Sequence, residues 1–286
     1  MTVRLVVFDF DGTLTDIADE GAQFETAYQT AVSGLFGADR LPIYLRCLEA
    51  VRAAAPELGW DMGSGTTAPG DADPYITASL AFTRFCDTVE LPLLAGSEPK
   101  AVALRAQVSG ALYQSAYGSL RPAFRPDAEA VLNVALRRAP HVRIITNSAT
   151  AKVAHKLRHL KLDRPLGVAG DARKFEVSEP VCSGYGIGGV ASVWQLASLT
   201  RTLLPRRGRY FDVLAEVWRD TGTTPQETLV VGDIVELDLV LPGLLGARVH
   251  YVERDRTHAY EDEVLHALRD RASRGAALSA VVDRLP

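Results

Sequence analysis

The chain has 286 residues, of which 47% are hydrophobic, so it is long enough for one large domain or two modest ones, each with an apolar core. Its formal net charge of −4 is small, and charges of both signs are interspersed, which argues against nucleic acid as a main partner. The three cysteines lack disulfide or zinc spacing, and no apolar run approaches the length of a membrane span. We therefore expect a cytoplasmic protein that makes no membrane contact.

The first strand of the chain ends in two carboxylates. Residues 3–8 are mostly aliphatic or aromatic, which predicts a strand buried on both faces, and Asp9 and Asp11 follow it. Alternate residues of a strand share a face, so both carboxylates can approach one small site, and Gly12 lets the backbone turn there. In open α/β sheets, ligands bind beyond the carboxyl ends of the strands. We therefore expect the chemistry of this chain at this turn.

A helical segment follows the first strand. Apolar residues recur at three- and four-residue steps, and no strand-like alternation stands out between residues 16 and 120. A stretch rich in Gly, Thr, Asp and Pro, residues 59–74, predicts a long loop inside this segment. We predict a separate all-helical domain over residues 17–120, with helices over residues 16–37, 42–55, 75–88 and 100–117.

Alternating helices and strands resume after a proline-bearing linker at residues 121–126. Strands are predicted over residues 142–146, 166–169, 228–233 and 249–252, and helices over residues 127–138, 150–160, 210–220 and 262–271, with an amphipathic segment at 278–285. This order predicts a doubly wound, Rossmann-like parallel sheet formed by residues 1–16 and 121–286. The helix over residues 150–160 carries a basic face that we expect to be exposed.

Three strands of this predicted sheet end in polar side chains. One ends at Asp9 and Asp11, one at Thr146 and Asn147, and one at Asp233. A single acid after a strand is commonly only a helix cap, but several acids buried together require a compensating cation. Carboxylate oxygens suit Mg²⁺, which can lie between an acid cluster and a phosphate. The sequence therefore predicts a magnesium site where these strands end.

The same residues carry a family resemblance. Asp9-Phe10-Asp11-Gly12-Thr13 resembles the first motif of the haloacid dehalogenase-like hydrolase superfamily, and Ile145-Thr146-Asn147 resembles the second. Gly232-Asp233, continuing to Asp238, resembles the acidic fourth motif. The order and spacing of the motifs match as well. The resemblance implies a Rossmann-like core, and the helical insertion matches the superfamily's cap domain by position and character.

The resemblance also implies roles for these residues. Asp9 would attack the phosphorus of a phosphomonoester, and Asp11 would protonate the leaving oxygen and later activate water. Asp9, Asp233 and the main-chain carbonyl of Asp11 would hold Mg²⁺, and Asp238 would complete the acidic shell or orient a ligand from outside it. The expected substrate-binding residues are Gly12, Thr13, Thr146 and Asn147, with Thr146 holding phosphoryl oxygens.

The third motif departs from the pattern. The superfamily places a lysine ahead of the helix that leads to the acidic strand, and counting back from Asp233 puts Arg207 there. Arginine keeps the charge but is wider than an ammonium group. Lys174 is the other candidate, because its turn follows a predicted core strand. Either residue could supply the catalytic cation.

An acid at position 11 favours a phosphatase over a dehalogenase within the superfamily, because a halide leaves without a proton. The interpretation is a magnesium-dependent phosphatase that acts on a small phosphorylated metabolite. A phosphomutase would share every core residue, and the altered third motif leaves a non-catalytic binding or regulatory protein open. Substrate choice is expected to lie in the helical insertion, and the sequence does not indicate an oligomeric state.

Overall fold

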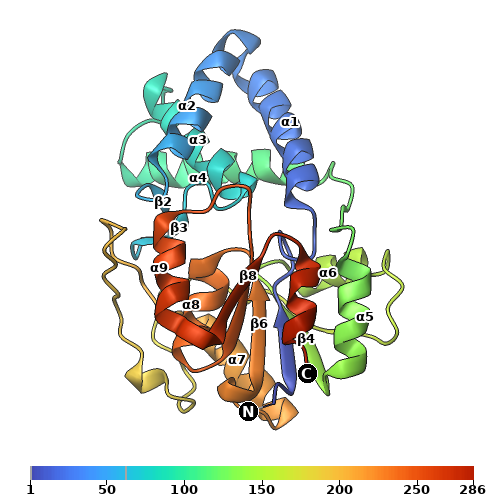
Figure 1. The fold of residues 1–286 in the computed structure, drawn as a ribbon. Coiled ribbons are helices and arrows are strands. Elements are labelled where there is room, and N and C mark those ends of the chain that lie inside the picture. Colours follow the sequence, from blue (N-terminus) through green and yellow to red (C-terminus); the bar gives the residue numbers. More distant parts are fainter. Residues whose placement is uncertain (1, 62) are drawn as a thin grey trace. The chain divides into compact units, whose positions relative to one another are not determined.

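The computed structural model describes residues 2–61 and 63–286 (Figure 1). By its internal contacts the chain divides into two compact units. One, the α/β unit, comprises residues 1–16, 61–68 and 124–286, and the other, the helical unit, comprises residues 17–60 and 69–123.

A parallel sheet forms the centre of the α/β unit, with strand order β5-β4-β1-β6-β7-β8. The strands β1, β4, β6 and β7 lie where apolar runs predicted them, and β5 falls within the predicted short strand. Strand β8 was not predicted, because Ala-Ser-Arg-Gly carries no apolar alternation. The strand bounds are Leu5–Phe8 (β1), His141–Ile145 (β4), Gly167–Ala169 (β5), Thr228–Gly232 (β6), Arg248–Val252 (β7) and Ala272–Gly275 (β8).

Helices cover both faces of this sheet (Figure 1). Leu5 and Val7 of β1 pack with α7, α8 and α9, whereas Val6 and Phe8 pack with α5 and α6 on the opposite face. Burial on both faces explains why the central strands are continuous apolar runs. The predicted doubly wound fold class is confirmed. The helix bounds are Ala128–Arg138 (α5), Thr150–Leu157 (α6), Gly208–Thr221 (α7), Val240–Leu244 (α8) and Ala259–Leu268 (α9).

A long irregular connection, residues 175–207, joins the turn after β5 to α7. Its regular structure among the described residues is limited to a 3-10 helix, Ile187–Gly189, and short bridges such as the antiparallel one between Trp194 and Leu203. The connection is tied to the helices by side chains. The Asp212 carboxylate of α7 accepts hydrogen bonds from the backbone amides of Val181 and Cys182 at 3.1 and 2.7 Å.

The helical unit contains α1 (Ile17–Phe36), α2 (Leu41–Ala54), α3 (Pro74–Thr88) and α4 (Pro99–Tyr117), close to the predicted helices. Its core is rich in aromatic rings, with Phe24 packed against Tyr28, Tyr75 and Tyr113. Helix α3 begins at a capping aspartate, because the Asp73 side chain accepts the backbone amide of Ile76 at 2.6 Å.

The loop predicted over residues 59–74 is in part wrong. It contains two short paired strands, β2 (Gly59–Asp61) and β3 (Thr66–Pro69), which form a hairpin. The contacts place residues 61–68 with the α/β unit and residues 121–123 with the helical unit, the reverse of the sequence assignment. Glycine and threonine spacing in the hairpin gave no strand periodicity. That each unit is an independent domain stays a prediction.

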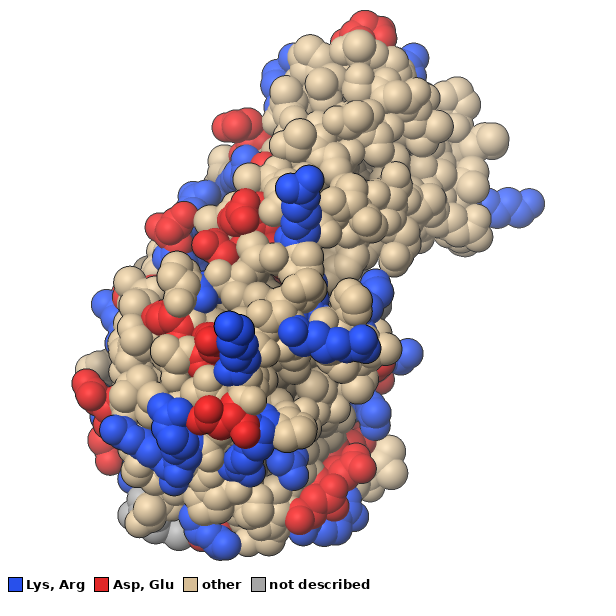
Figure 2. Space-filling view, turned by 90° about the vertical axis from the view of Figure 1, so that its right-hand side faces the viewer, with Lys and Arg blue, Asp and Glu red and all other residues tan. Residues whose placement is uncertain are grey.

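Charged side chains of both signs are interspersed on the face of the molecule that Figure 2 shows. Every helix in the described part of the chain is too short or too polar to cross a membrane.

Candidate active site

The central strands bring the predicted acids to one edge of the sheet. Strand β1 lies between β4 and β6, and Phe8, the last residue of β1, pairs in register with Ile144 and Val231. The backbone amide of Asp9 still donates to the Val231 carbonyl at 2.8 Å. The segments that follow these three strands therefore leave the sheet together, as the polar strand ends predicted.

A buried ion pair lies at this edge. The Lys174 ammonium group donates to Asp9 Oδ1 at 2.6 Å and to Asp238 Oδ1 at 2.8 Å, and the lysine is only 1% exposed. Its backbone amide donates to Asn147 Oδ1 at 2.7 Å, which fixes the turn after β5. The Tyr210 ring centroid lies 5.4 Å from Nζ. Lys174 is therefore the cation that faces Asp9.

Asp238 is fully engaged within the protein. Its Oδ1 binds Lys174, and its Oδ2 accepts the backbone amide of Ile234 at 2.9 Å. The Tyr210 hydroxyl donates to the Asp238 main-chain carbonyl at 2.9 Å. These bonds hold the turn after β6 and give Asp238 the position of a residue that orients the lysine.

Asp233 lies against the turn that follows β1. The Thr13 hydroxyl is 3.0 Å from Asp233 Oδ1 and 3.3 Å from Asp9 Oδ2, so it bridges the two acids. One carboxylate oxygen from each of Asp9, Asp233 and Asp238 lies within 4.8 Å of the others. Gly12 makes the close approach possible, because a Cβ there would overlap Asp233 Oδ2 and lie 2.8 Å from its Cγ.

The buried carboxyl groups at this edge of the sheet outnumber the buried cations beside them. Burial raises the pKa of Asp9 to about 7, with Lys174 opposing the shift and Asp238 adding to it. Burial also raises the pKa of Asp233, and repulsion from Asp238 and Asp9 adds to the effect. Burial alone would lower the pKa of Lys174, but attraction to Asp238 and Asp9 outweighs it and raises the pKa. One ammonium therefore does not balance the three carboxylates.

The Asp11 carboxyl group contacts residues outside this cluster of acids. Its Oδ2 accepts a hydrogen bond from the Ser148 hydroxyl at 2.6 Å, just before α6. The turn that carries it is held by Arg125, whose Nε and Nη2 both donate to the Gly12 carbonyl, at 3.0 and 2.9 Å. The two acids of the first turn thus have different surroundings.

Comparison with known proteins identifies this architecture. The sequence matches no protein-family model, and no curated protein matches it. The structure is similar to that of a predicted phosphoglycolate phosphatase from Haemophilus somnus 129pt, with a TM-score of 0.56, 13% identity and coverage of 99% of this chain and 98% of that chain. A haloacid dehalogenase-like hydrolase from Bacteroides fragilis gives a TM-score of 0.52, 13% identity and coverage of 96% and 97%.

The chain has the haloacid dehalogenase-like fold. The predicted resemblance and fold class are thereby confirmed, and at these identities the likeness concerns the fold alone. Within the haloacid dehalogenase-like fold, the structure brings together Asp9, Gly12, Thr13, Lys174, Asp233 and Asp238. The catalytic and binding roles of these residues stay predictions.

The residues of the second motif contact the protein itself. The Thr146 hydroxyl accepts the backbone amide of Ser148 at 3.1 Å, and Thr146 is buried at the end of β4. Asn147 was predicted to bind substrate, and its side-chain oxygen accepts the Lys174 amide. Asn147 of the second motif is therefore bonded to the turn after β5 that carries Lys174, called the lysine turn below.

Arg207 does not face Asp9. Its Nη2 donates to the Thr67 carbonyl at 3.0 Å and its Nη1 to the Phe175 carbonyl at 3.3 Å. Burial lowers the pKa of Arg207 to about 10, with Glu236 opposing the shift. The usual motif spacing places the cation just before α7, at Arg207. In this chain the connection over residues 175–207 lies between Lys174 and that helix, so the spacing points to the wrong residue.

The donor set fits a hard divalent cation. Burial and mutual repulsion raise the pKa values of Asp9 and Asp233, so a cation beside them would stabilise their ionised forms, and Gly12 leaves room beside Asp233 that a side chain would fill. Carboxylate oxygens are the ligands that Mg²⁺ prefers in proteins. Asp238 fits a place outside the metal's ligands, because both of its oxygens already accept hydrogen bonds.

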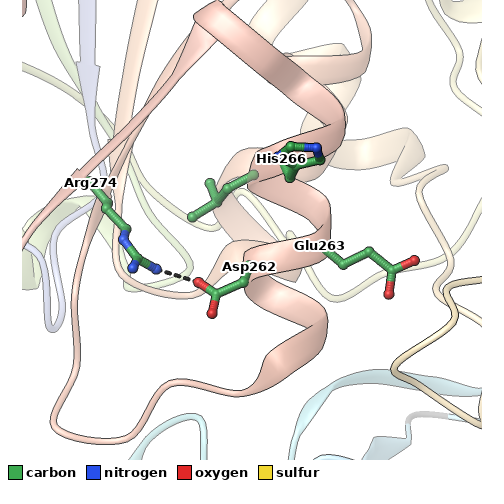
Figure 3. A pocket seen from close by; sticks show the side chains of 5 residues that line it. Asp262, Glu263, His266 and Arg274 are labelled. Carbon is green, nitrogen blue, oxygen red and sulfur yellow. Dashed lines mark hydrogen bonds and ion pairs between the residues drawn. The ribbon is translucent and has the colours of Figure 1, made fainter.

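A surface recess elsewhere in the α/β unit shares no residue with Asp9, Asp233 and Asp238, called here the acid cluster. It lies along α9 and is lined by Asp262, Glu263, Leu265, His266 and Arg274, as Figure 3 shows. Asp262 and Arg274 in its wall are paired with each other. The acid cluster, which brings the predicted residues together around Lys174, is the candidate active site.

Sequence reasoning missed two residues near Asp11. Ser148 directly follows the second motif, and Lys156 was placed on an exposed basic face of the helix over residues 150–160, which is wrong, because Lys156 is only 8% exposed. A signal was available for the lysine. Lys156 lies between the buried residues Val153 and Leu157 at helical spacing, so it falls on the apolar stripe of α6.

Proposed function

We propose that the chain is a magnesium-dependent phosphatase that hydrolyses a small phosphomonoester through an aspartyl-phosphate on Asp9. The observation that carries the proposal is the Asp9 carboxylate at the sheet edge, bonded to the buried Lys174 ammonium at 2.6 Å and bridged to Asp233 by Thr13. A nucleophilic carboxylate beside a fixed cation is suited to a substrate that brings its own negative charge.

The proposed reaction has two steps. In the first, an Asp9 carboxylate oxygen forms a bond to phosphorus while the bond from phosphorus to the leaving oxygen breaks, and Asp11 gives its proton to that oxygen. In the second, a water oxygen attacks phosphorus, Asp11 takes the water proton, and the bond between phosphorus and Asp9 breaks. Lys174 remains charged through both steps and holds Asp9 in place.

Asp9, Asp233 and the main-chain carbonyl of Asp11 would hold Mg²⁺. When bound, the metal supplies positive charge that neutralises the phosphoryl oxygens. Asp9 must be ionised to act as nucleophile, and Lys174 favours that form by opposing the rise in its pKa. The Thr13 hydroxyl, which contacts one oxygen of each acid, keeps the Asp9 and Asp233 carboxylates close to each other.

Asp11 supports a phosphatase over a dehalogenase. An alcohol leaving group needs a proton, whereas a halide leaves without one, and Asp11 is the acid that follows the nucleophile by two residues. The position of Lys174 supports a catalytic protein over a non-catalytic one, because the turn after β5 places beside Asp9 the cation that the sequence pattern lacked at Arg207.

The test is a phosphate-release screen over a broad set of phosphomonoesters with Mg²⁺. We expect release by the wild type, loss of at least about 10³-fold in the Asp9→Asn variant, and little change in Asp220→Asn, an exposed acid on α7. An acid-quenched sample should hold phosphate on the protein in a hydroxylamine-sensitive bond. Absence of release above the Asp9→Asn background would overturn the proposal, and isomerisation of a hexose 1-phosphate without free phosphate would assign a mutase instead.

A further inference from the structure

Asp11 is held by two residues that have no assigned role. The Ser148 hydroxyl donates to Asp11 Oδ2 at 2.6 Å, and Lys156 Nζ lies 3.9 Å from Asp11 Oδ1. Oδ1 is buried and has no hydrogen-bond partner within the described part of the chain. One oxygen of the carboxyl group is therefore fixed by Ser148, and the other lies beside the Lys156 ammonium without a hydrogen bond of its own.

Lys156 is unusual among the basic residues of α6. Lys152, His155 and Arg158 are exposed, whereas Lys156 is 8% exposed and its Nζ lies 5.7 Å from the centroid of the Phe10 ring. Burying an ammonium group is costly unless a counter-charge is near, and Asp11 provides one. The ion pair and the ring together restrict where the lysine, and with it Asp11, can lie.

We propose that Lys156 and Ser148 are positioning residues that orient the Asp11 carboxyl group for proton transfer to the leaving oxygen. The inference rests on the proposed function and deepens it. A proton donor must lie within hydrogen-bond reach of the leaving oxygen, and a small misplacement costs a large part of the rate. This positioning of the Asp11 carboxyl group matters most for esters of alkyl alcohols, whose leaving oxygen must be protonated as its bond to phosphorus breaks.

The leaving group provides the test. The nitrophenolate of p-nitrophenyl phosphate leaves without help from an acid, whereas the alcohol of an alkyl phosphomonoester does not. The readout is the ratio of kcat/KM for the best alkyl phosphomonoester of the screen to kcat/KM for p-nitrophenyl phosphate. In Lys156→Met we expect this ratio to fall by about 10-fold or more, and in Ser148→Ala we expect it to fall in the same direction.

Three controls separate positioning from folding. Lys152→Met, an exposed lysine one turn earlier on α6, should leave the ratio unchanged, and Lys156→Arg, which keeps the charge, should restore most of it. In an Asp11→Ala background, Lys156→Met should no longer change the ratio, because the group it positions is absent. A structural role alone would lower both kcat/KM values equally.

Each outcome decides between the two proposals. An active wild type whose Lys156→Met variant loses equally on both substrates, or on neither, overturns this inference and leaves the phosphatase proposal standing. A wild type without phosphate release overturns the proposed function and this inference with it.

Discussion

Gly12 shows how the first motif depends on one residue without a side chain. Its φ of +84° lies in the left-handed region, where a Cβ is unfavourable, and a Cβ would also overlap the Asp233 carboxylate. The backbone and the neighbouring acid therefore impose the same requirement. Glycine lets the turn after β1 approach the turn after β6.

We predict that Gly12→Ala loses both stability and function. The backbone strain costs about 1–2 kcal/mol of unfolding free energy, and displacement of Asp233 weakens metal binding and phosphate release. Gly222→Ala is the matched control, because Gly222 has a φ of +59° but no atom within 4 Å of its added Cβ. The control should be destabilised in urea unfolding yet keep full activity, and an equally inactive Gly222→Ala would contradict the prediction.

The buried side chain of His250 affects how the stability of the fold depends on pH. It is 1% exposed on β7, where Nδ1 lies 2.9 Å from the Ser273 hydroxyl and Nε2 has no hydrogen-bond partner in the described chain. Burial lowers the pKa of His250 to about 4, and Arg284 adds to the effect. Below pH 6.5 the unfolded chain binds a proton at this histidine that the folded chain does not.

Stability should therefore fall as the pH drops from about 6.5 to about 4, by up to about 3 kcal/mol from this group. In His250→Gln the slope of unfolding free energy against pH should be shallower over that window. His266→Gln, an exposed histidine on α9, serves as the control and should keep the wild-type slope. Urea unfolding at half-unit pH intervals measures both, and identical slopes in all three proteins would refute the assignment to His250.

At the scale of elements, Arg207 joins three segments. It stands at the start of α7 and donates to Thr67 in the β2–β3 hairpin and to Phe175, the residue after Lys174. Arg207 is 1% exposed, so losing its guanidinium would leave both carbonyls without this donor. Arg207 therefore stabilises the hairpin and the lysine turn together.

We predict that Arg207→Met lowers the unfolding free energy by about 2–4 kcal/mol and speeds amide hydrogen exchange over residues 66–68. Arg207→Lys should recover part of the loss, since an ammonium reaches fewer acceptors than a guanidinium. Arg209→Met, exposed on the same helix, is the control. Exchange that is unchanged in Arg207→Met would show that the hairpin is held by other contacts.

At the scale of the molecule, the sheet and its acid cluster could be predicted because their signals are local. Parallel strands buried on both faces are apolar runs, and their carboxyl ends meet at one edge, so Asp9 and Asp233 could be placed together. The four helices of the helical unit followed from apolar periodicity in the same way.

The remaining features depend on tertiary contacts that leave little trace in local sequence. Arg207 and Lys174 were equal candidates by residue type, and only the folded connection of residues 175–207 shows which reaches Asp9. Lys156 was read as part of a charged helix face, yet its partner Asp11 is 145 positions earlier in the chain. Side-chain direction at such positions is decided by packing between distant segments.

The acid cluster also has a consequence for the stability of the whole α/β unit. Burial and repulsion from Asp238 and Asp9 raise the pKa of Asp233, because its ionised form is unfavourable in the protein without a cation beside it. A bound cation should reverse this, adding about 2.7 kcal/mol of stability when Mg²⁺ is present at about 100 times its dissociation constant.

The Asp233→Asn variant removes one buried charge and one metal ligand at once. We therefore expect this variant to melt at a higher temperature than the wild type without metal, and to gain little from Mg²⁺. Asp220→Asn should respond to Mg²⁺ as the wild type does, and calorimetry with and without the metal measures all three. An undiminished Mg²⁺ response in Asp233→Asn would place the metal away from this acid.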